Sequence, residues 1–291
     1  MRSPARLRQE AETLAGPLPP LLAAAEHLAS SVMAGEHGRR RTGQGDQFWQ
    51  YRPSTPGDEA RAIDWRRSAR SDALFVREKE WQAAQSVMLW VDPGQSMEFS
   101  SAKTLATKAD TARKIALALA VLLNRAGERV GLSNAGLPPR AGQVQLVRLT
   151  EALGDKADET EYTPPELRGV PARSRAVFIS DFLGNIDTVE DVLTRAADRG
   201  VSGALMQVLD PQEEAFPFDG RTIFESVGGS LSHETLKAKD LRDRYLDRLA
   251  ERKDRLRSLA RSTGWQYHCH HTDTSEAAAL LWLYTALERR H

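Results

Sequence analysis

Short apolar runs alternate with amphipathic segments from about residue 83 to the end of the chain. Three of the runs are continuously apolar and end in aspartate, as strands buried on both faces of a parallel sheet do; they cover residues 86–92, 176–181 and 203–210. Shorter strands are expected at 129–133 and 265–270. Helical periodicity predicts helices at 103–126, from 146 to 153, and at 188–199, 233–263 and 275–290. This alternation predicts an α/β fold with a doubly wound, mainly parallel sheet.

The first 82 residues follow a different pattern. Apolar residues at helical spacing after a proline-rich stretch predict a helical N-terminal arm over residues 1–34. Residues 35–82 are rich in Arg, Gly, Pro and aromatic side chains, with strand-like positions near 48–51 and 74–76 and a turn at 56–58. We therefore predict three parts: the arm, a β-rich segment at 35–82 and an α/β domain at 83–291.

Charge gives no support to a nucleic-acid partner. The chain has 40 Lys and Arg residues against 40 Asp and Glu residues, so its formal net charge is zero. The most basic run, Arg39 to Arg41, lies in a stretch of near balance, with ten basic and eight acidic residues from 36 to 80. A solvated or internally paired surface explains that stretch better than a nucleic-acid site.

Other features indicate a soluble, cytoplasmic protein without membrane insertion. No apolar run reaches the roughly 18 residues that a spanning helix needs, and the N-terminus lacks the apolar core of a signal peptide. The one cysteine, Cys269, stands within the run His268 to His271. In a strand His268 and His270 face away from Cys269. We interpret the run as the end of the last strand rather than as a zinc site.

Candidate chemistry lies where the strands end, because ligands of open α/β sheets bind beyond the carboxyl ends of the strands. Asp92 and Asp181 end two predicted strands, and Ser96 follows Asp92 at short spacing. Two carboxylates and a hydroxyl are hard oxygen ligands that suit Mg²⁺. The alternative is that strand-end aspartates cap the helices and turns that follow them. The spacing alone leaves both interpretations open.

Catalytic motifs are missing from the sequence. No Gly-x-Ser-x-Gly elbow surrounds Ser96, and no phosphate-binding Gly-x-x-x-x-Gly-Lys loop is present. A Mg²⁺-dependent hydrolase or phosphotransferase using Asp92 and Asp181 is the alternative function, but the sequence offers no nearby general base. We therefore expect a protein that is not an enzyme.

Two sets of residues resemble a known family. The segment Asp92-x-Gly94-x-Ser96, with Ser180-Asp181-Phe182, resembles the metal-ion-dependent adhesion site of von Willebrand factor A domains. An upstream block resembles the bacterial domain-of-unknown-function family 58, in which such a block precedes a von Willebrand factor A-like domain. It comprises Gly43, Gly45, Phe48, Arg52, Pro56-Gly57-Asp58, Arg61, Ile63-Asp64-Trp65 and Ser68-Ala69-Arg70, with Pro211, Glu214, Phe216, Phe218 and Gly220 as a later segment.

The resemblance implies a protein-binding or adaptor role. Such proteins are linked with MoxR-type AAA+ ATPases in the maturation or assembly of protein complexes, and no enzymatic activity is established for the family. Many members carry N-terminal membrane helices, which this sequence lacks. Within the block, Arg61, Asp64, Trp65 and Arg70 are the candidate partner-binding residues, although ion pairs with nearby acidic residues would also explain the charged ones.

The adhesion-site pattern is degenerate in this chain. Gly94 replaces a metal-binding serine, and the loop after residues 129–133 offers Ser133 and Asn134 instead of a threonine. Mg²⁺ is therefore a possible cofactor with weakened affinity, held by Asp92, Ser96 and Asp181. A partner's acidic side chain would complete its coordination.

Overall fold

The computed structural model describes residues 41–43, 47–55, 58, 63–70, 73–81, 84–154, 160–225 and 232–288. The chain divides into two compact units, one within Glu36–Gln85 and one containing Ser86–His291. The predicted arm at 1–34 lies outside the described residues. No described helix is both long enough and apolar enough to cross a membrane.

The smaller unit is an antiparallel sheet with a short helix. Its strands are β1 (Arg41–Gly43), β2 (Gln47–Pro53) and β3 (Phe75–Trp81), in the order β1-β3-β2. The helix α3 (Trp65–Ser68) begins at Asp64, whose side chain caps it. The two strands expected from the aromatic and apolar positions are therefore present.

The larger unit is built on a six-stranded sheet in the order β11-β8-β7-β4-β5-β6. Neighbouring strands are parallel except that the edge strand β6 runs antiparallel to β5. The strands are β4 (Ser86–Val91), β5 (Arg129–Leu132), β6 (Leu137–Arg140), β7 (Arg175–Ser180), β8 (Ser202–Leu209) and β11 (Gln266–His271).

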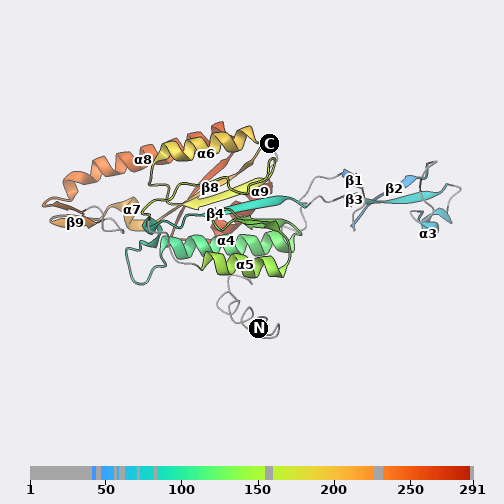
Figure 1. The fold of residues 1–291 in the computed structure, drawn as a ribbon, viewed down its shortest axis with the longest axis horizontal. Helices are drawn as coiled ribbons and strands as arrows, with labels where there is room; N and C mark the ends of the chain where they lie inside the picture. The colour runs from blue at the N-terminus through green and yellow to red at the C-terminus, as the bar shows by residue number, and fades with distance from the viewer. Residues whose placement is uncertain are drawn as a thin grey trace. The chain divides into compact units, whose positions relative to one another are not determined.

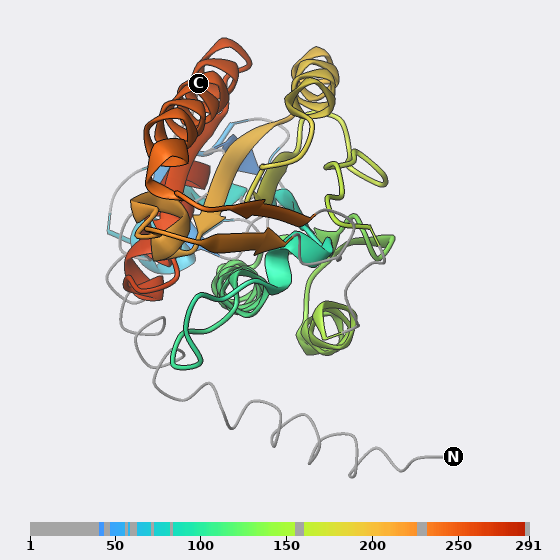
Figure 2. The ribbon, with the colours of Figure 1, turned by 90° about the vertical axis from the view of Figure 1, so that its left-hand side faces the viewer.

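Helices cover both faces of this sheet (Figures 1 and 2). On one face lie α4 (Lys108–Arg125), α5 (Gln143–Leu153) and α9 (Glu276–Glu288); on the other lie α6 (Ile186–Asp198) and α8 (Lys239–Ser262). Alternate residues of β4 enter the two cores, with Leu89 on the α4 side and Trp90 on the α6 side. The predicted doubly wound, mainly parallel α/β fold is confirmed.

Two helix boundaries and one strand differ from the prediction. The helix expected from 103 begins only at Lys108, and a 3₁₀ turn, η2 (Gln95–Glu98), lies upstream of it. The helix expected from 233 begins at Lys239, because β10 (Ser232–Thr235) pairs with β9 (Thr222–Glu225). The strand β6 was not predicted, since two prolines occupy it; an edge strand tolerates them.

Candidate functional site

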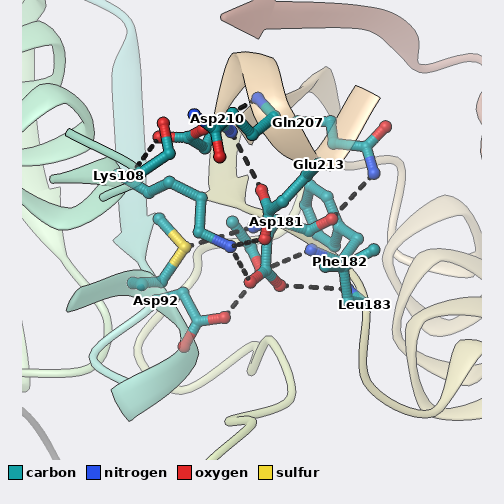
Figure 3. A network of polar contacts seen from close by, with 12 residues as sticks. Asp92, Lys108, Asp181, Phe182, Leu183, Gln207, Asp210 and Glu213 are labelled. Carbon is teal, nitrogen blue, oxygen red and sulfur yellow. Dashed lines mark hydrogen bonds and ion pairs between the residues drawn. The ribbon is translucent and has the colours of Figure 1, made fainter. Parts of the chain in front are cut away.

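The carboxyl ends of three adjacent strands bring three buried aspartates to one edge of the sheet. Asp92, Asp181 and Asp210 follow β4, β7 and β8, which are neighbours in the sheet. Figure 3 shows them with the side chains that contact them. The convergence of Asp92 and Asp181 that the sequence predicts is therefore found.

Asp210 is a helix cap. Its side chain accepts hydrogen bonds from the backbone N–H of Gln212 and of Ser101, both at 2.8 Å. The short helix α7 (Pro211–Ala215) begins there, and Glu213 completes a capping box by accepting from the Asp210 N–H. For this strand-end aspartate the capping interpretation is correct.

Asp181 is engaged by a lysine that the sequence analysis did not identify. The Lys108 ammonium donates to Asp181 Oδ2 at 2.8 Å and to Glu213 Oε1 at 2.7 Å. Its side chain is 1% exposed. Lys108 stands in the first turn of α4, and helical side chains point back toward the N-terminus, which here lies at the carboxyl edge of the sheet.

Neighbouring charges and burial act in opposite directions on the ionisation of Lys108 and Glu213. Burial opposes the charged form of Lys108, but Asp181 and Glu213 outweigh it and raise the pKa of the ammonium. Burial raises the pKa of Glu213, against the opposing effect of Lys108. The ammonium therefore stays charged, in a pair with Asp181 that is almost fully buried.

Asp92 is held by neutral donors. Its Oδ1 accepts from the Gly94 N–H at 2.8 Å, and its Oδ2 accepts from the Ser180 hydroxyl at 2.6 Å. Burial raises the pKa of Asp92 to about 6; the two hydrogen bonds oppose the shift, and the charge of Asp181 adds to it. Asp92 thus differs from Asp181, whose carboxylate is paired with the Lys108 ammonium.

A cavity of about 110 Å³ borders Asp92. Aromatic and proline side chains, a glycine and several hydroxyl or amide groups line it: Tyr162, Thr163, Pro164, Pro165, Ser180, Phe182, Gly184, Asn185, Thr188 and Val189. The cavity lies between the strand ends and the start of α6, where open α/β sheets receive ligands.

The remaining candidate ligands, Ser96, Ser133 and Asn134, differ in their hydrogen bonds. Ser96 is buried, and within the described part of the chain its Oγ has no hydrogen-bond partner. Ser133 and Asn134 donate to the backbone carbonyls of Leu89 and Val91, at 3.3 and 3.2 Å. Ser133 and Asn134 therefore hold the carboxyl end of β5 against β4.

Gly94 is enclosed by backbone. A Cβ atom there would lie 2.8 Å from the Glu161 carbonyl oxygen and 2.9 Å from Asp92 Oδ1. The segment around Glu161 is fixed in place, because Gln95 and Ser96 donate their N–H groups to the carbonyls of Thr160 and Glu161, both at 2.9 Å. A serine at position 94 would have no room unless this segment moved.

The residues do not fit the Mg²⁺ ion that the adhesion-site resemblance implies. One feature favours a metal, namely the unpartnered Ser96 hydroxyl. Against it, the Lys108 ammonium already occupies Asp181 Oδ2, and Glu161 excludes a ligand-bearing side chain at Gly94. A divalent ion beside Lys108 would meet strong repulsion.

The candidate partner-binding residues of the smaller unit have mixed roles. Asp64 caps α3 by accepting from the Arg67 N–H at 3.0 Å, and it also accepts from the Tyr51 hydroxyl at 3.2 Å. Trp65 is 60% exposed, and Arg70 is also exposed. Arg61 lies outside the described residues. Asp64 thus has a structural role, while Trp65 and Arg70 remain available at the surface.

The His268 to His271 run alternates as expected. The His268 ring stacks on Trp282, whereas Cys269 and His271 gather on the other face with Glu214 of α7. The three possible ligand atoms lie within 4.8 Å of one another, and Lys253 pairs with Glu214. Glu214 is 55 positions before Cys269 in the chain, so local spacing could not reveal this group.

Lys108 and Glu213 are site residues that sequence reasoning missed. Two signals pointed to them. Lys108 precedes Ala112 and Ile115 by four and seven positions, so it lies on the buried stripe of its helix. Glu213 follows Asp210 by three positions, which is the spacing of a capping box.

Comparisons with known proteins find relatives of this chain. The chain is 28% identical over 228 residues to the uncharacterized proteins Rv1480 of Mycobacterium tuberculosis (strain ATCC 25618 / H37Rv) and Mb1516 of Mycobacterium bovis (strain ATCC BAA-935 / AF2122/97). These alignments cover 74% of this chain and 71% of each relative.

Similar solved structures include the conserved hypothetical protein BatB of Bacteroides thetaiotaomicron, with a TM-score of 0.41, 13% identity and coverage of 70% of this chain and 98% of that one. The SpRpn10 VWA domain has a TM-score of 0.35 and 8% identity, with coverage of 68% and 94%. Residues 50–255 match the model of the family described as "Protein of unknown function DUF58", and the chain therefore belongs to the DUF58 family, as its upstream block predicted.

Proposed function

We propose that this chain is a non-enzymatic protein-binding module, and that its partner docks at the carboxyl edge of the sheet over the cavity beside Asp92. The observation that carries the proposal is the placement of that cavity. It combines a buried carboxylate with aromatic and hydroxyl groups at the edge where such sheets bind ligands. Tyr162, at 43% exposed, offers an aromatic anchor at its mouth.

A MoxR-type AAA+ ATPase is the proposed partner, and maturation or assembly of protein complexes is the proposed setting. This part of the proposal rests on the family resemblance of the upstream block. In the smaller unit, exposed Trp65 and Arg70 support a second contact area, because Trp and Arg are enriched among residues that dominate binding energy.

The contact between Asp92 and its partner is proposed to be direct. A Mg²⁺ ion bridging to a partner's acidic side chain would require Asp181 to release Lys108. The same requirement weakens the alternative of a Mg²⁺-dependent hydrolase or phosphotransferase, since that chemistry also needs Asp92 and Asp181 together on a metal.

Binding to the purified MoxR-type ATPase of the same organism tests the proposal. We expect Asp92→Asn and Tyr162→Ala to weaken binding at least tenfold by calorimetry or surface plasmon resonance. Asp191→Asn, an exposed aspartate of α6, is the matched control and should bind like the wild type. If both cavity variants bind as tightly as the control, the cavity is not the docking site.

A further inference from the structure

A buried lysine ammonium lies where the carboxylates of the site converge. Figure 3 shows Lys108 reaching from α4 to Asp181 and Glu213, with Asp92 on the adjoining strand end. Burying an ammonium group is costly, and an ion pair is often replaceable by apolar side chains without loss of stability. The position of this lysine among oxygen ligands therefore calls for a functional explanation.

We propose that the Lys108 ammonium is a built-in cation, which fills the place of a divalent ion at Asp181 and makes the strand-end site independent of metal. The inference concerns metal binding by the chain alone. It therefore holds or fails separately from the docking of a partner.

The hydrogen bonds of Asp181 support this assignment. Its Oδ1 accepts from the Leu183 N–H at 3.0 Å, and its Oδ2 accepts from Lys108 at 2.8 Å. Both carboxylate oxygens are thus engaged in a side chain that is buried. A metal ion at Oδ2 would have to displace the ammonium or approach it closely, and either event is unfavourable.

The two carboxylates that hold the Lys108 ammonium would otherwise be available as metal ligands. Asp181 Oδ2 and Glu213 Oε1 lie 2.8 and 2.7 Å from its Nζ atom. Such oxygen ligands, completed by water, suit Mg²⁺ or Mn²⁺. Removing the Lys108 side chain would leave the carboxylates of Asp181 and Glu213 without their counter-charge, and it would leave space for an ion beside them. The proposal therefore predicts that loss of Lys108 creates a metal site.

Titration of the full chain with Mn²⁺, followed by the electron paramagnetic resonance signal of the free ion, provides the test. We expect Lys108→Ala to bind one Mn²⁺ at least tenfold more tightly than the wild type. The double variant Lys108→Ala/Asp181→Asn should lose this gain. Lys114→Ala is the matched control, because Lys114 lies on the same helix in a half-exposed pair with Glu276, and it should resemble the wild type.

Two results would overturn the proposal. One is tight Mn²⁺ binding by the wild type that Asp181→Asn abolishes, since the lysine would then not exclude the ion. The other is a folded Lys108→Ala variant that binds Mn²⁺ no better than the wild type. If Lys108→Ala is unfolded without metal, far-ultraviolet circular dichroism replaces the binding signal: refolding on addition of Mn²⁺ supports the proposal, and no refolding counts against it.

Discussion

At the scale of single residues, Asp92 keeps a charge in surroundings that disfavour it. The raised pKa means that its ionised form is less stable in the folded chain than in the unfolded one. Binding sites commonly keep such groups at some cost to stability. Lys108 is the opposite case, because its partners stabilise the charge that burial disfavours.

Replacing Asp92 by Asn should stabilise the fold in a pH-dependent way. Between the ordinary value of 3.8 and about 6, the folded wild type binds more protons at Asp92 than the unfolded chain does. The contribution of Asp92 to the free energy of unfolding of the wild type therefore falls as the pH rises through that range. Asn can accept from Gly94 and donate to Ser180 without this loss. We expect Asp92→Asn to be more stable than the wild type at pH 8, by on the order of 2–3 kcal/mol at most.

Urea unfolding at pH 8, 5 and 4 measures this difference. The advantage of Asp92→Asn should shrink as the pH is lowered, while Asp191→Asn should show no comparable trend. An equal difference from wild type at pH 4 and pH 8 would show that the burial of Asp92 does not perturb its ionisation.

At the scale of elements, the central strands β4, β7 and β8 were predictable because each is a continuous apolar run between the two helical layers. The elements that were not predicted form by pairing with a neighbouring strand, a few residues away in the chain. β10 forms by pairing with β9, although its charged residues continue the helical pattern of α8. β6 contains two prolines that only an edge position accommodates. The helical and strand preferences of the residues in β6 and β10 do not by themselves reveal either pairing.

The short helix α7 joins the end of β8 to the lysine network, because Asp210 caps the helix and Glu213 within it contacts Lys108. Asp210→Ala removes the cap of α7 and the acceptor for the Ser101 N–H. We expect a loss of about 1–2 kcal/mol in the free energy of unfolding. Chemical denaturation measures it, with Asp243→Ala, an exposed substitution within α8, as the control that should change little. Equal stability of both variants would mean that the cap contributes nothing.

At the scale of the whole molecule, the carboxyl edge of one sheet carries all the strand-end candidates. Sequence was sufficient to predict the fold, the family and the approach of Asp92 to Asp181. It did not predict that Lys108 would reach Asp181, since the lysine lies 73 positions earlier in the chain and its destination depends on how α4 packs. Nor could it show that the Glu161 backbone encloses Gly94.

A cation supplied by the chain itself should make partner binding insensitive to chelators. We expect the affinity for the MoxR-type ATPase, measured without nucleotide, to be the same with excess EDTA as with millimolar Mg²⁺. Omitting nucleotide keeps the ATPase's own metal requirement out of the comparison. A large loss of affinity in EDTA, restored by Mg²⁺, would return the metal-bridged contact to consideration.

The backbone of Glu161 over Gly94 also limits which substitutions the site can accept. A serine at position 94 would push against that backbone while Lys108 still held Asp181. Removing Lys108 first would leave its buried carboxylates without their counter-charge. Each change taken alone removes packing space or charge compensation from a buried site and lowers the stability of the metal-free chain. The lysine-filled form therefore resists single substitutions, because the metal-free chain loses stability with either change.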